Sequence, residues 1–548
     1  MSIDNAANAR PAHARTFTRR YDGPWVVSAL LEDRAARFGD DVAVSLADGT
    51  DVTYGDWAAR AALVAGGLAG LGVEPDDRVA TMLDPSITYL ETWFASAWVG
   101  AIEVPINTDF KGEFLRHVLE ESGAAVLVMD ARWADRLSGM DLAALRHVVL
   151  VGGDAPEPVT ADSWTITSFD EMLVGARPLD RVERTEHDTV YVMYTSGTSG
   201  PSKGAIHSNR SALWNAFAWL DVLELGDDDV AYSMFPLFHV TARSAVITST
   251  IWAGGTVVLR HGFSVSGFWD DVRSSHATFF AYMGSVIHLL WSARPDDLDG
   301  DNRLRVAFGA AAPPDIVDGF ERRFGVELME VYGSTELGLA TAPRPGRRVR
   351  GTMGVPCDHV EIEIHDEAGR VQPAGESGEI VARPRSPQAI FQGYWRNADA
   401  TVLAFRDLWF RTGDRGYLRQ DGNLVFTDRI KDTIRRRGEN ISSFEVERAV
   451  QQHDDIVEAA AYALPSDIGE EEVGLAVIRR SGSTVSAADL FGFCVETMPR
   501  FAVPRFIRFV DELPKTPSQR IQKFKLRNEG VTRDTSDREE LGILVPRS

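Results

Sequence analysis

The sequence predicts an α/β fold, with a large N-terminal part built from βαβ units and a smaller α+β domain near the C-terminus. The first observation is that short apolar runs alternate with longer helical patterns between Asp41 and about Leu259, as in RVATML (78–83), AAVLVMD (124–130) and RHVVLV (146–151). Such alternation is typical of parallel strands joined by helices. The second is the length of 548 residues, which corresponds to roughly three to four domains.

The third observation is a change of pattern near Glu361. The run EIEIHDEAGRVQPAGESGEIVARP alternates apolar and polar positions between turn-forming residues, which is typical of small antiparallel strands. Beyond Ser443 the pattern predicts a compact βα domain, followed by a charged, loose tail from about Arg527. We therefore predict a large domain over 1–430, a smaller domain over 431–527 and a polar tail over 528–548.

The charge balance of the chain argues against nucleic acid as a binding partner. The chain has 57 Lys and Arg against 80 Asp and Glu, a formal charge of -23, which disfavours nucleic acid because phosphate-backbone binding needs a cationic surface. A local cluster of donors can still bind a small anion. Cys357 and Cys494 lack metal or disulfide spacing, and no apolar run resembles a secretory signal or membrane span. We expect a cytoplasmic protein without integral membrane association; the sequence does not indicate an oligomeric state.

The strongest local signal is YTSGTSGPSKGA, from Tyr194 to Ala205. It follows an apolar strand pattern and offers backbone N–H groups, hydroxyls and the Lys203 ammonium, which together suit phosphate oxygens. It is not a Walker A motif, because Ser202 rather than Gly precedes the lysine. A flexible surface loop is the alternative interpretation of such a Gly/Ser-rich run.

Four further segments combine small and charged residues: FGAAAP (308–313), YGSTELG (332–338), RTGDRGYL (411–418) and DRIKDTIRRRGENIS (428–442). Each also has a purely structural interpretation, respectively a turn before a proline-led helix, a solvated carboxylate, a turn aspartate and a charged strand. His239 stands out in the apolar stretch MFPLFHV, where a histidine is more often a core residue than a catalyst.

Taken in order, these segments resemble the signatures of the adenylate-forming superfamily of acyl-CoA synthetases, adenylation domains and luciferases, and the resemblance covers nearly the whole chain. The chain looks most like crotonobetaine/carnitine-type CoA ligases. The resemblance implies an acyl-CoA synthetase-like fold with a mobile C-terminal domain. It also implies an ATP-dependent, AMP-forming ligase that uses Mg²⁺, activates a small carboxylic acid as acyl-AMP and transfers the acyl group to coenzyme A.

The resemblance also assigns residues to roles. Those expected to contact the nucleotide are Thr195, Ser196, Gly197, Thr198, Ser199, Gly200, Lys203, Gly309, Ala310, Ala311, Tyr332, Gly333, Ser334, Thr335, Asp414, Phe426 and Arg429. Those expected to line the pantetheine tunnel are Arg437, Gly438 and Glu439. Those expected to be catalytic are Lys203, His239, Thr335, Glu336 and Arg520, with Glu336 holding the metal. Lys431 is expected to be the hinge.

One segment departs from the family. The family's PxTxxGK loop ends in a lysine, whereas here LPKTPSQRIQKFK places Gln519 and Arg520 at its last two positions. Arg is planar and directional, so the exchange is not conservative. We favour the hypothesis that Arg520 acts in place of the lysine; Lys523 acting instead, or weak adenylation, are the alternatives. An amine or carrier-protein acceptor, and a catalytically impaired ATP- or acyl-binding protein, also stay open.

Overall fold

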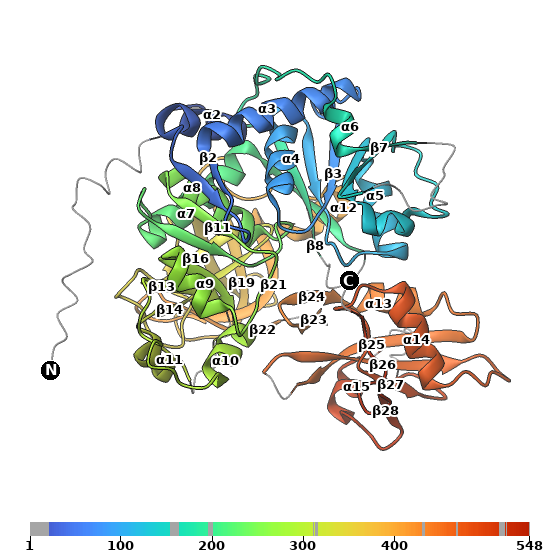
Figure 1. The fold of residues 1–548 in the computed structure, drawn as a ribbon. Helices are drawn as coiled ribbons and strands as arrows, with labels where there is room; N and C mark the ends of the chain where they lie inside the picture. Colours follow the sequence, from blue (N-terminus) through green and yellow to red (C-terminus); the bar gives the residue numbers. More distant parts are fainter. Residues whose placement is uncertain are drawn as a thin grey trace.

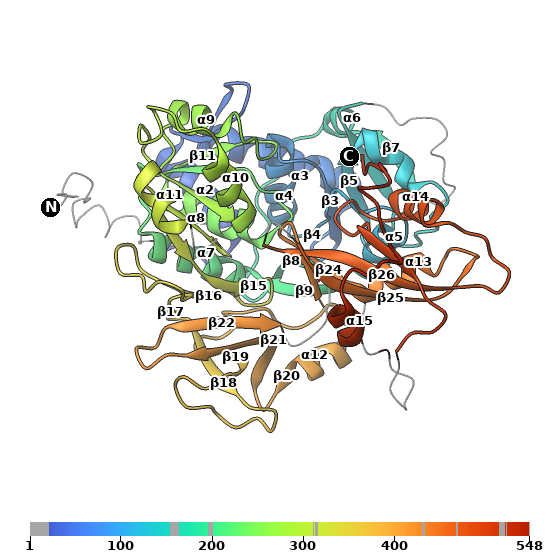
Figure 2. The ribbon, with the colours of Figure 1, turned by 90° about the horizontal axis from the view of Figure 1, so that it is seen from below.

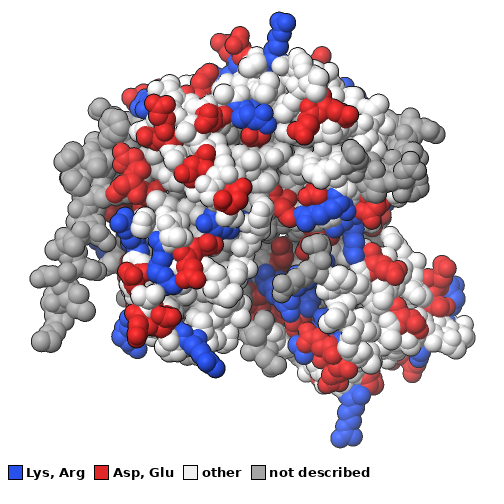
Figure 3. All heavy atoms as spheres, viewed as in Figure 1, with Lys and Arg blue, Asp and Glu red and all other residues white. Residues whose placement is uncertain are grey.

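The chain folds into a large part and a smaller C-terminal part, which lie side by side (Figure 1). A computed structural model describes residues 21–153, 164–195, 201–310, 312, 316–429, 433–466, 469–514, 521 and 523–546. Basic and acidic side chains gather around the hollow between the two parts (Figure 3). Within the described residues, no helix is both long and apolar enough to span a bilayer.

The first large sheet confirms the predicted βαβ pattern. Its strands are parallel except for the last pair, β8 and β9. In sheet order they are β7 (Thr165–Ser168), β6 (His147–Val151), β5 (Val126–Asp130), β3 (Arg78–Met82), β4 (Ile102–Pro105), β8 (Thr189–Thr195) and β9 (Lys203–Ser208). The β8–β9 edge carries the Gly/Ser-rich loop.

The second large sheet is also mainly parallel. In sheet order its strands are β14 (Glu327–Glu330), β13 (Val306–Ala310), β12 (Phe279–Met283), β10 (Val230–Ser233), β11 (Thr256–Leu259), β1 (Val42–Ser45) and β2 (Asp51–Thr53). Because parallel strands end at a common edge, the carboxyl ends of β12 and β13 bring their terminal residues together there.

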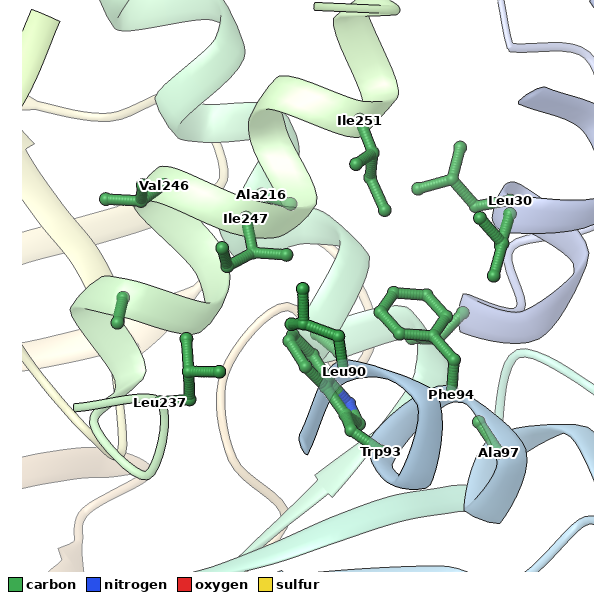
Figure 4. Close-up of a cluster of buried hydrophobic side chains, with 14 of the residues drawn as sticks. Leu30, Leu90, Trp93, Phe94, Ala97, Ala216, Leu237, Val246, Ile247 and Ile251 are labelled. Atoms are coloured by element: carbon green, nitrogen blue, oxygen red, sulfur yellow. The ribbon is translucent and has the colours of Figure 1, made fainter. Parts of the chain in front are cut away.

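One hydrophobic core joins the two sheets. It contains apolar side chains from strands of both sheets and from the helices packed with them, and Figure 4 shows Leu90, Trp93 and Phe94 meeting Leu237, Ile247 and Ile251 there. The helices are α2 (Val27–Phe38), α3 (Tyr54–Gly70), α4 (Ile87–Trp98), α7 (Asn209–Leu223), the π-helix η2 (Thr241–Thr248) and α8 (Ser249–Ala253). This core fixes the two sheets relative to each other.

Helix α6 (Phe169–Leu173) also packs Phe169 and Met172 into this core. Outside it lie α5 (Gly112–Ser122), the 3₁₀ helix η1 (Ala131–Leu137), α9 (Phe268–Ser275), α10 (Gly284–Ser292) and α11 (Val317–Phe324). An antiparallel region follows, as the change of pattern near Glu361 predicts. It contains β15 (Tyr332–Ser334), β16 (Gly338–Ala342), β17 (Val355–Pro356), β18 (Val360–His365), β19 (Gly378–Pro384), α12 (Ala398–Ala404), β20 (Phe405–Arg406), β21 (Trp409–Leu418) and β22 (Leu424–Arg429).

The C-terminal part has its own hydrophobic core, which begins at Ile434 and also takes in Phe114 of the large part. Its elements are β23 (Thr433–Arg436), β24 (Glu439–Ser442), α13 (Ser443–Val450), β25 (Ile456–Pro465), β26 (Glu471–Arg479), α14 (Ala487–Thr497), β27 (Phe506–Phe509), α15 (Lys523–Glu529) and β28 (Thr535–Asp537). Figures 1 and 2 show β24, which pairs with β23, lying between the rest of this part and the large sheets. The predicted boundary at Lys431 lies outside the described residues.

The prediction of a loose tail is wrong for the described residues up to 546. Strand β28 pairs antiparallel with β27, and Asp537 lies 3.1 Å from Arg505. Arg508 similarly pairs with Asp534 at 2.8 Å. The charges that made this segment look solvated are matched by Arg505, just before β27, and by Arg508 on β27, and composition alone does not reveal such long-range pairing.

Candidate active site

Lys203 begins β9, directly after the Gly/Ser-rich loop, and pairs in register with Thr195 of β8. Ser196, Gly197, Thr198, Ser199 and Gly200 lie outside the described residues. The segment ending at Trp395 runs beside β9, since the Trp395 N–H donates to the Gly204 carbonyl at 2.7 Å. Through this pairing the Lys203 ammonium lies 5.1 Å from the centre of the Tyr394 ring.

Glu336 and Thr335 lie in the short turn between β15 and β16, where Ser334 pairs with Gly338. This turn is a tight antiparallel hairpin rather than the start of a helix. The Tyr394 hydroxyl donates to Glu336 Oε1 at 3.0 Å. Burial and the Glu336 carboxylate raise the pKa of Tyr394 above its usual range, so the phenol stays protonated. Tyr394 therefore links Lys203 to Glu336, although neither is near it in sequence.

Asp414 is joined to the same hairpin. The Tyr332 hydroxyl, at the start of β15, donates to Asp414 Oδ2 at 2.8 Å. Asp414 pairs across β21 and β22 with Arg429, whose side chain lies outside the described set. The Phe426 ring lies 6.3 Å from the Tyr332 ring, centre to centre. The predicted RTGD aspartate and YGSTELG tyrosine are thus direct neighbours.

Gly309 and Ala310 end β13 beside Tyr282 and Met283 of β12. The Val331 N–H donates to the Gly309 carbonyl at 3.0 Å, which places this strand end against the start of β15. A Cβ at Gly309 would lie 2.0 Å from the Tyr282 carbonyl oxygen, so a side chain is excluded by sterics. Ala311 lies outside the described residues.

The structure therefore brings four separated sequence motifs to one place. Side-chain contacts connect Lys203 with Glu336 through Tyr394, and Tyr332 with Asp414. The β15–β16 hairpin joins the two pairs, and Gly309 adjoins them through the backbone. Gly333 and Ser334 lie on β15 between Tyr332 and the Glu336 turn. Among the described residues, no three His, Cys, Asp or Glu side chains form a metal cluster.

The C-terminal part reaches this region with the turn between β23 and β24. Arg437 and Gly438 form the turn with φ values of 51° and 83°, the left-handed pair that a two-residue hairpin needs. A Cβ on Gly438 would lie 3.3 Å from Met283. Glu439 Oε1 lies 3.1 Å from His239 Nε2. Gly438 and Glu439, two of the residues predicted to line the tunnel, thus face β12 and the predicted catalytic residue His239.

The position of His239 is fixed by its neighbours. It precedes η2, and a π-helix is a local irregularity often found at functional sites. Four residues later, the buried Arg243 forms an ion pair with the buried Glu103 of β4. Burial of the His239 ring opposes protonation, but the Glu439 carboxylate outweighs it and raises the pKa of His239. The imidazole therefore binds the C-terminal part more strongly when it is charged.

A second contact between the two parts involves a residue that the sequence analysis missed. Glu445, in the first turn of α13, accepts a hydrogen bond at 2.6 Å from the Ser202 N–H, next to Lys203. Burial raises the pKa of Glu445 to about 7 despite this bond. An acid in the first helical turn is ordinarily a solvated residue, so the sequence carried no signal for this role. Tyr394 was missed because its role depends on contacts with residues far away in sequence.

Of the two candidates for the missing lysine, Lys523 lies in the described part of the chain. Arg520 lies outside the described residues. Lys523 lies 2.6 Å from Glu447 and donates to the Ser443 hydroxyl at 2.7 Å, both within the C-terminal part. The Lys523 ammonium is therefore engaged within the C-terminal part.

Comparison with known proteins agrees with this geometry. The AMP-binding enzyme family matches residues 31–395, and the C-terminal domain of AMP-binding enzymes matches residues 445–520. The chain belongs to the AMP-binding enzyme family. It is similar to a crotonobetaine/carnitine–CoA ligase from Salmonella typhi, with 32% identity over 469 residues that cover 83% of this chain and 89% of the relative.

Solved structures confirm the predicted fold class. ATP-bound MatB from Rhodopseudomonas palustris has a TM-score of 0.69 and 26% identity, and the match covers 92% of this chain and 99% of MatB. The amide bond synthetase McbA from Marinactinospora thermotolerans has a TM-score of 0.78 and 26% identity, over the same shares of the two chains. Both similarities extend through the large and C-terminal parts.

Proposed function

We propose that this chain is an ATP-dependent, AMP-forming acid–thiol ligase. It converts a carboxylic acid to its acyl-adenylate and then to a coenzyme A thioester. The observation that carries the proposal is the convergence of Lys203, Glu336 and Asp414, which lie far apart in sequence, through Tyr394 and Tyr332. The CoA ligase name of the relative at 32% identity supports the acceptor.

In the first half-reaction, a carboxylate oxygen attacks the α-phosphorus of ATP in line and pyrophosphate leaves. Asp414 accepts hydrogen bonds from the ribose, and Tyr332 packs beside the adenine. The small residues Gly309 and Ala310 leave room for the base. Lys203 and the Thr335 hydroxyl stabilise charge on the phosphates, and Arg520 supplies the second cation. The products are acyl-AMP and pyrophosphate.

Mg²⁺ fits this donor set. It commonly binds through one or two carboxylates plus substrate phosphates, and Glu336 provides one partly exposed carboxylate, oriented by Tyr394. Bound there, the ion would neutralise phosphate charge during transfer. Tyr394 leaves the other Glu336 oxygen available, since its hydroxyl contacts Oε1.

In the second half-reaction, the thiol sulfur attacks the acyl carbonyl, AMP leaves and one proton is released. The contacts of Gly438 with Met283 and of Glu439 with His239 support this arrangement as the one that forms the thioester. We propose that the C-terminal domain swings about Lys431 between the half-reactions, because attack at the α-phosphorus and attack at the acyl carbonyl carbon require different donors around the same carboxyl group. The Lys523 contacts with Glu447 and Ser443 favour Arg520 as the adenylating cation.

The direct test is ATP–pyrophosphate isotope exchange with a panel of carboxylic acids, followed by product analysis with coenzyme A. We expect acid-dependent exchange and an acyl-CoA product, and Arg520→Ala should suppress the exchange. Release of AMP without pyrophosphate exchange would contradict the scheme. Exchange at the parent rate in Arg520→Ala would overturn the role of Arg520.

An amine acceptor is the second candidate, favoured by the similarity to McbA. It predicts an amide in place of a thioester, so supplying amines and coenzyme A in competition separates the two. Binding of nucleotide without turnover of any acid would instead indicate a catalytically impaired protein. Cys357 and Cys494 are both free, which fits the reducing cytoplasm that we propose as its location.

A further inference from the structure

A buried ion pair connects the two large sheets, four residues after His239. Glu103 lies on β4 of the first sheet, and Arg243 lies on η2, which follows β10 of the second. The side chains of both residues are 1% exposed. The Arg243 guanidinium donates through two nitrogens to the two carboxylate oxygens of Glu103, and this paired geometry makes the contact directional. The pair therefore fixes the guanidinium relative to the first sheet.

Aromatic side chains also hold the guanidinium. Its central carbon lies 3.7 Å from the centre of the Trp93 ring of α4 and 5.2 Å from that of the Tyr191 ring of β8. Arg243 donates to the Tyr89 hydroxyl at 3.4 Å. Glu103 pairs in register with Tyr191 across β4 and β8, so the carboxylate lies on a hydrogen-bonded part of the sheet. Arg243 cannot shift without disturbing several of these contacts at once.

Stability alone does not account for this pair. Taking two charges out of water is costly, and apolar side chains of similar volume are often neutral or stabilising in place of a buried ion pair. The surrounding core already consists of apolar and aromatic side chains, which could accommodate such a replacement. A guanidinium differs from an apolar side chain because its planar donors fix the positions of the groups that accept from it. The identity of those acceptors therefore indicates what the pair does.

One acceptor belongs to the turn that carries His239. Arg243 Nη1, which contacts Glu103 Oε1 at 3.2 Å, also donates to the Leu237 carbonyl at 3.2 Å. The Arg243 backbone N–H donates to the His239 carbonyl at 3.2 Å. The His239 ring is partly exposed, so its position depends on the backbone of this turn. The ion pair thus supports the turn from within the core.

We propose that Arg243, anchored by Glu103, is a positioning residue that holds His239 opposite Glu439 for thioester formation. This inference rests on the proposed thiol acceptor. Arg243 acts through His239, because it fixes the Leu237 carbonyl two residues before the histidine. A displacement of about 1 Å at a reacting centre can slow a reaction substantially, even when the altered residue is remote from the chemistry. The alternative is that the pair only connects the two sheets.

The main test removes both charges at once, with Arg243→Met and Glu103→Leu in one variant. No uncompensated charge is left and the volume is similar, so this double variant should fold and melt near the parent temperature. We expect transfer from preformed acyl-AMP to coenzyme A to slow by about tenfold. Pyrophosphate exchange should stay within about twofold of the parent, because the Arg243 contacts described above do not involve Lys203, Glu336 or Asp414.

Arg323→Met combined with Asp299→Leu is the matched control. Arg323 also pairs with a carboxylate, Asp299, at 2.6 Å, and also donates to a backbone carbonyl, that of Trp291 at 2.9 Å. It lies on α11 and supports the end of α10 rather than the His239 turn. The rates of both half-reactions in this control should equal those of the parent.

A second comparison separates positioning from a purely structural role. If Arg243 acts through His239, the double change should slow transfer no further in an enzyme that already carries His239→Ala. A purely structural pair predicts the same loss with or without the histidine. If the double variant does not fold, Arg243→Lys takes its place, because it keeps the charge opposite Glu103 but not the planar fork. We expect Arg243→Lys to slow transfer by about threefold, as for one weakened hydrogen bond.

Transfer at the parent rate in the folded double variant would overturn the proposal, as would transfer at the parent rate in Arg243→Lys where that variant takes its place. An equal further loss in the His239→Ala background would also overturn it, because Arg243 would then act by another route.

A parent enzyme that makes no thioester with any thiol would refute the thiol acceptor itself. The position of His239 is then judged by nuclear magnetic resonance of the imidazole, with His239→Ala identifying its signal. Burial opposes protonation of this ring, but Glu439 outweighs burial and raises the pKa of His239. A pKa in the double variant that is lower than in the parent, toward about 6.5, supports positioning by Arg243, and equal pKa values refute it.

Discussion

The two sides of the active site are held together in different ways. On the large domain, Asp414 and Glu336 sit on paired strands or in a tight hairpin turn, and each accepts a tyrosine hydrogen bond from the same domain. On the C-terminal side, the contacts cross between domains. Glu439 meets the His239 ring, and Glu445 meets the Ser202 N–H.

The nucleotide side is therefore preformed within one domain, whereas the C-terminal side is formed by contacts that can be broken. Preorganised donors act without reorganisation at the moment of reaction, which suits the nucleotide side. Phe114 of the large part also packs on the C-terminal core, but these two polar crossing contacts involve His239 and Glu445, whose pKa values are raised. Such contacts can be made and broken at little cost. Changes on the large domain should therefore affect adenylation, and changes at the two polar crossing contacts should affect only thioester formation.

The largest effect is expected from Asp414→Ala. It removes the carboxylate proposed to bind the ribose and leaves the Tyr332 hydroxyl without its acceptor. Because one charge-assisted hydrogen bond is worth about 1.5–3 kcal/mol, kcat/KM for ATP should fall by more than about 100-fold for two such bonds. Pyrophosphate exchange measures this. Asp421→Ala, in the turn joining the same strands, is the control, and an unchanged KM for ATP in Asp414→Ala would remove Asp414 from the site.

The sequence predicted the large-domain side more completely than the C-terminal side. Lys203, Glu336 and Asp414 lie in local motifs with strand patterns around them, so their positions could be inferred from the order of segments. Tyr394 and Glu445 have no such pattern, because their roles depend on which distant backbone each meets. The C-terminal segment looked loose for a similar reason, since its acidic residues pair with Arg505 and Arg508 only once β27 has formed.

A smaller and more selective effect is expected from Glu439→Gln. The change removes the charge that faces His239 Nε2 at 3.1 Å. Transfer from preformed acyl-AMP to coenzyme A should slow by about fivefold, since partial exposure of His239 weakens the pair. Pyrophosphate exchange should stay within twofold of the parent. Equal losses in both half-reactions would contradict the separation of the two sides.

Tyr394→Phe tests the bridge between Lys203 and Glu336. The phenyl ring still lies under the Lys203 ammonium, and only the hydroxyl bond to Glu336 is lost. Adenylation should slow by about threefold, as expected for one hydrogen bond, and the requirement for Mg²⁺ should rise. A magnesium titration of pyrophosphate exchange checks both, with Tyr462→Phe in the C-terminal part as control. If the magnesium requirement is unchanged, Tyr394 does not orient the metal-binding carboxylate.

The smallest effect is a pH dependence of docking. Glu445 has a pKa of about 7 when docked, because of burial, against about 4.3 for an exposed glutamate. At a pH between these two pKa values, the docked state therefore holds one more proton than the undocked state. Docking is strongest at low pH and weakens as the pH rises to about 7. His117 and Glu121 of α5 and Tyr194 of β8 surround the same contact. The raised pKa of His239 acts in the same direction.

Amide hydrogen exchange around Ser202 measures this docking, because Glu445 covers the Ser202 N–H. After correction for intrinsic rates, protection in the parent should be about twofold greater at pH 6 than at pH 8, as partial proton linkage predicts. Glu445→Gln should reduce this difference, and adding Glu439→Gln should remove the remainder contributed by His239. Glu376→Gln, an exposed change on the large domain, should leave it intact. Greater protection at pH 8 than at pH 6 would contradict this prediction. It would exclude Glu445 as the titrating group, because burial disfavours the ionised form of Glu445.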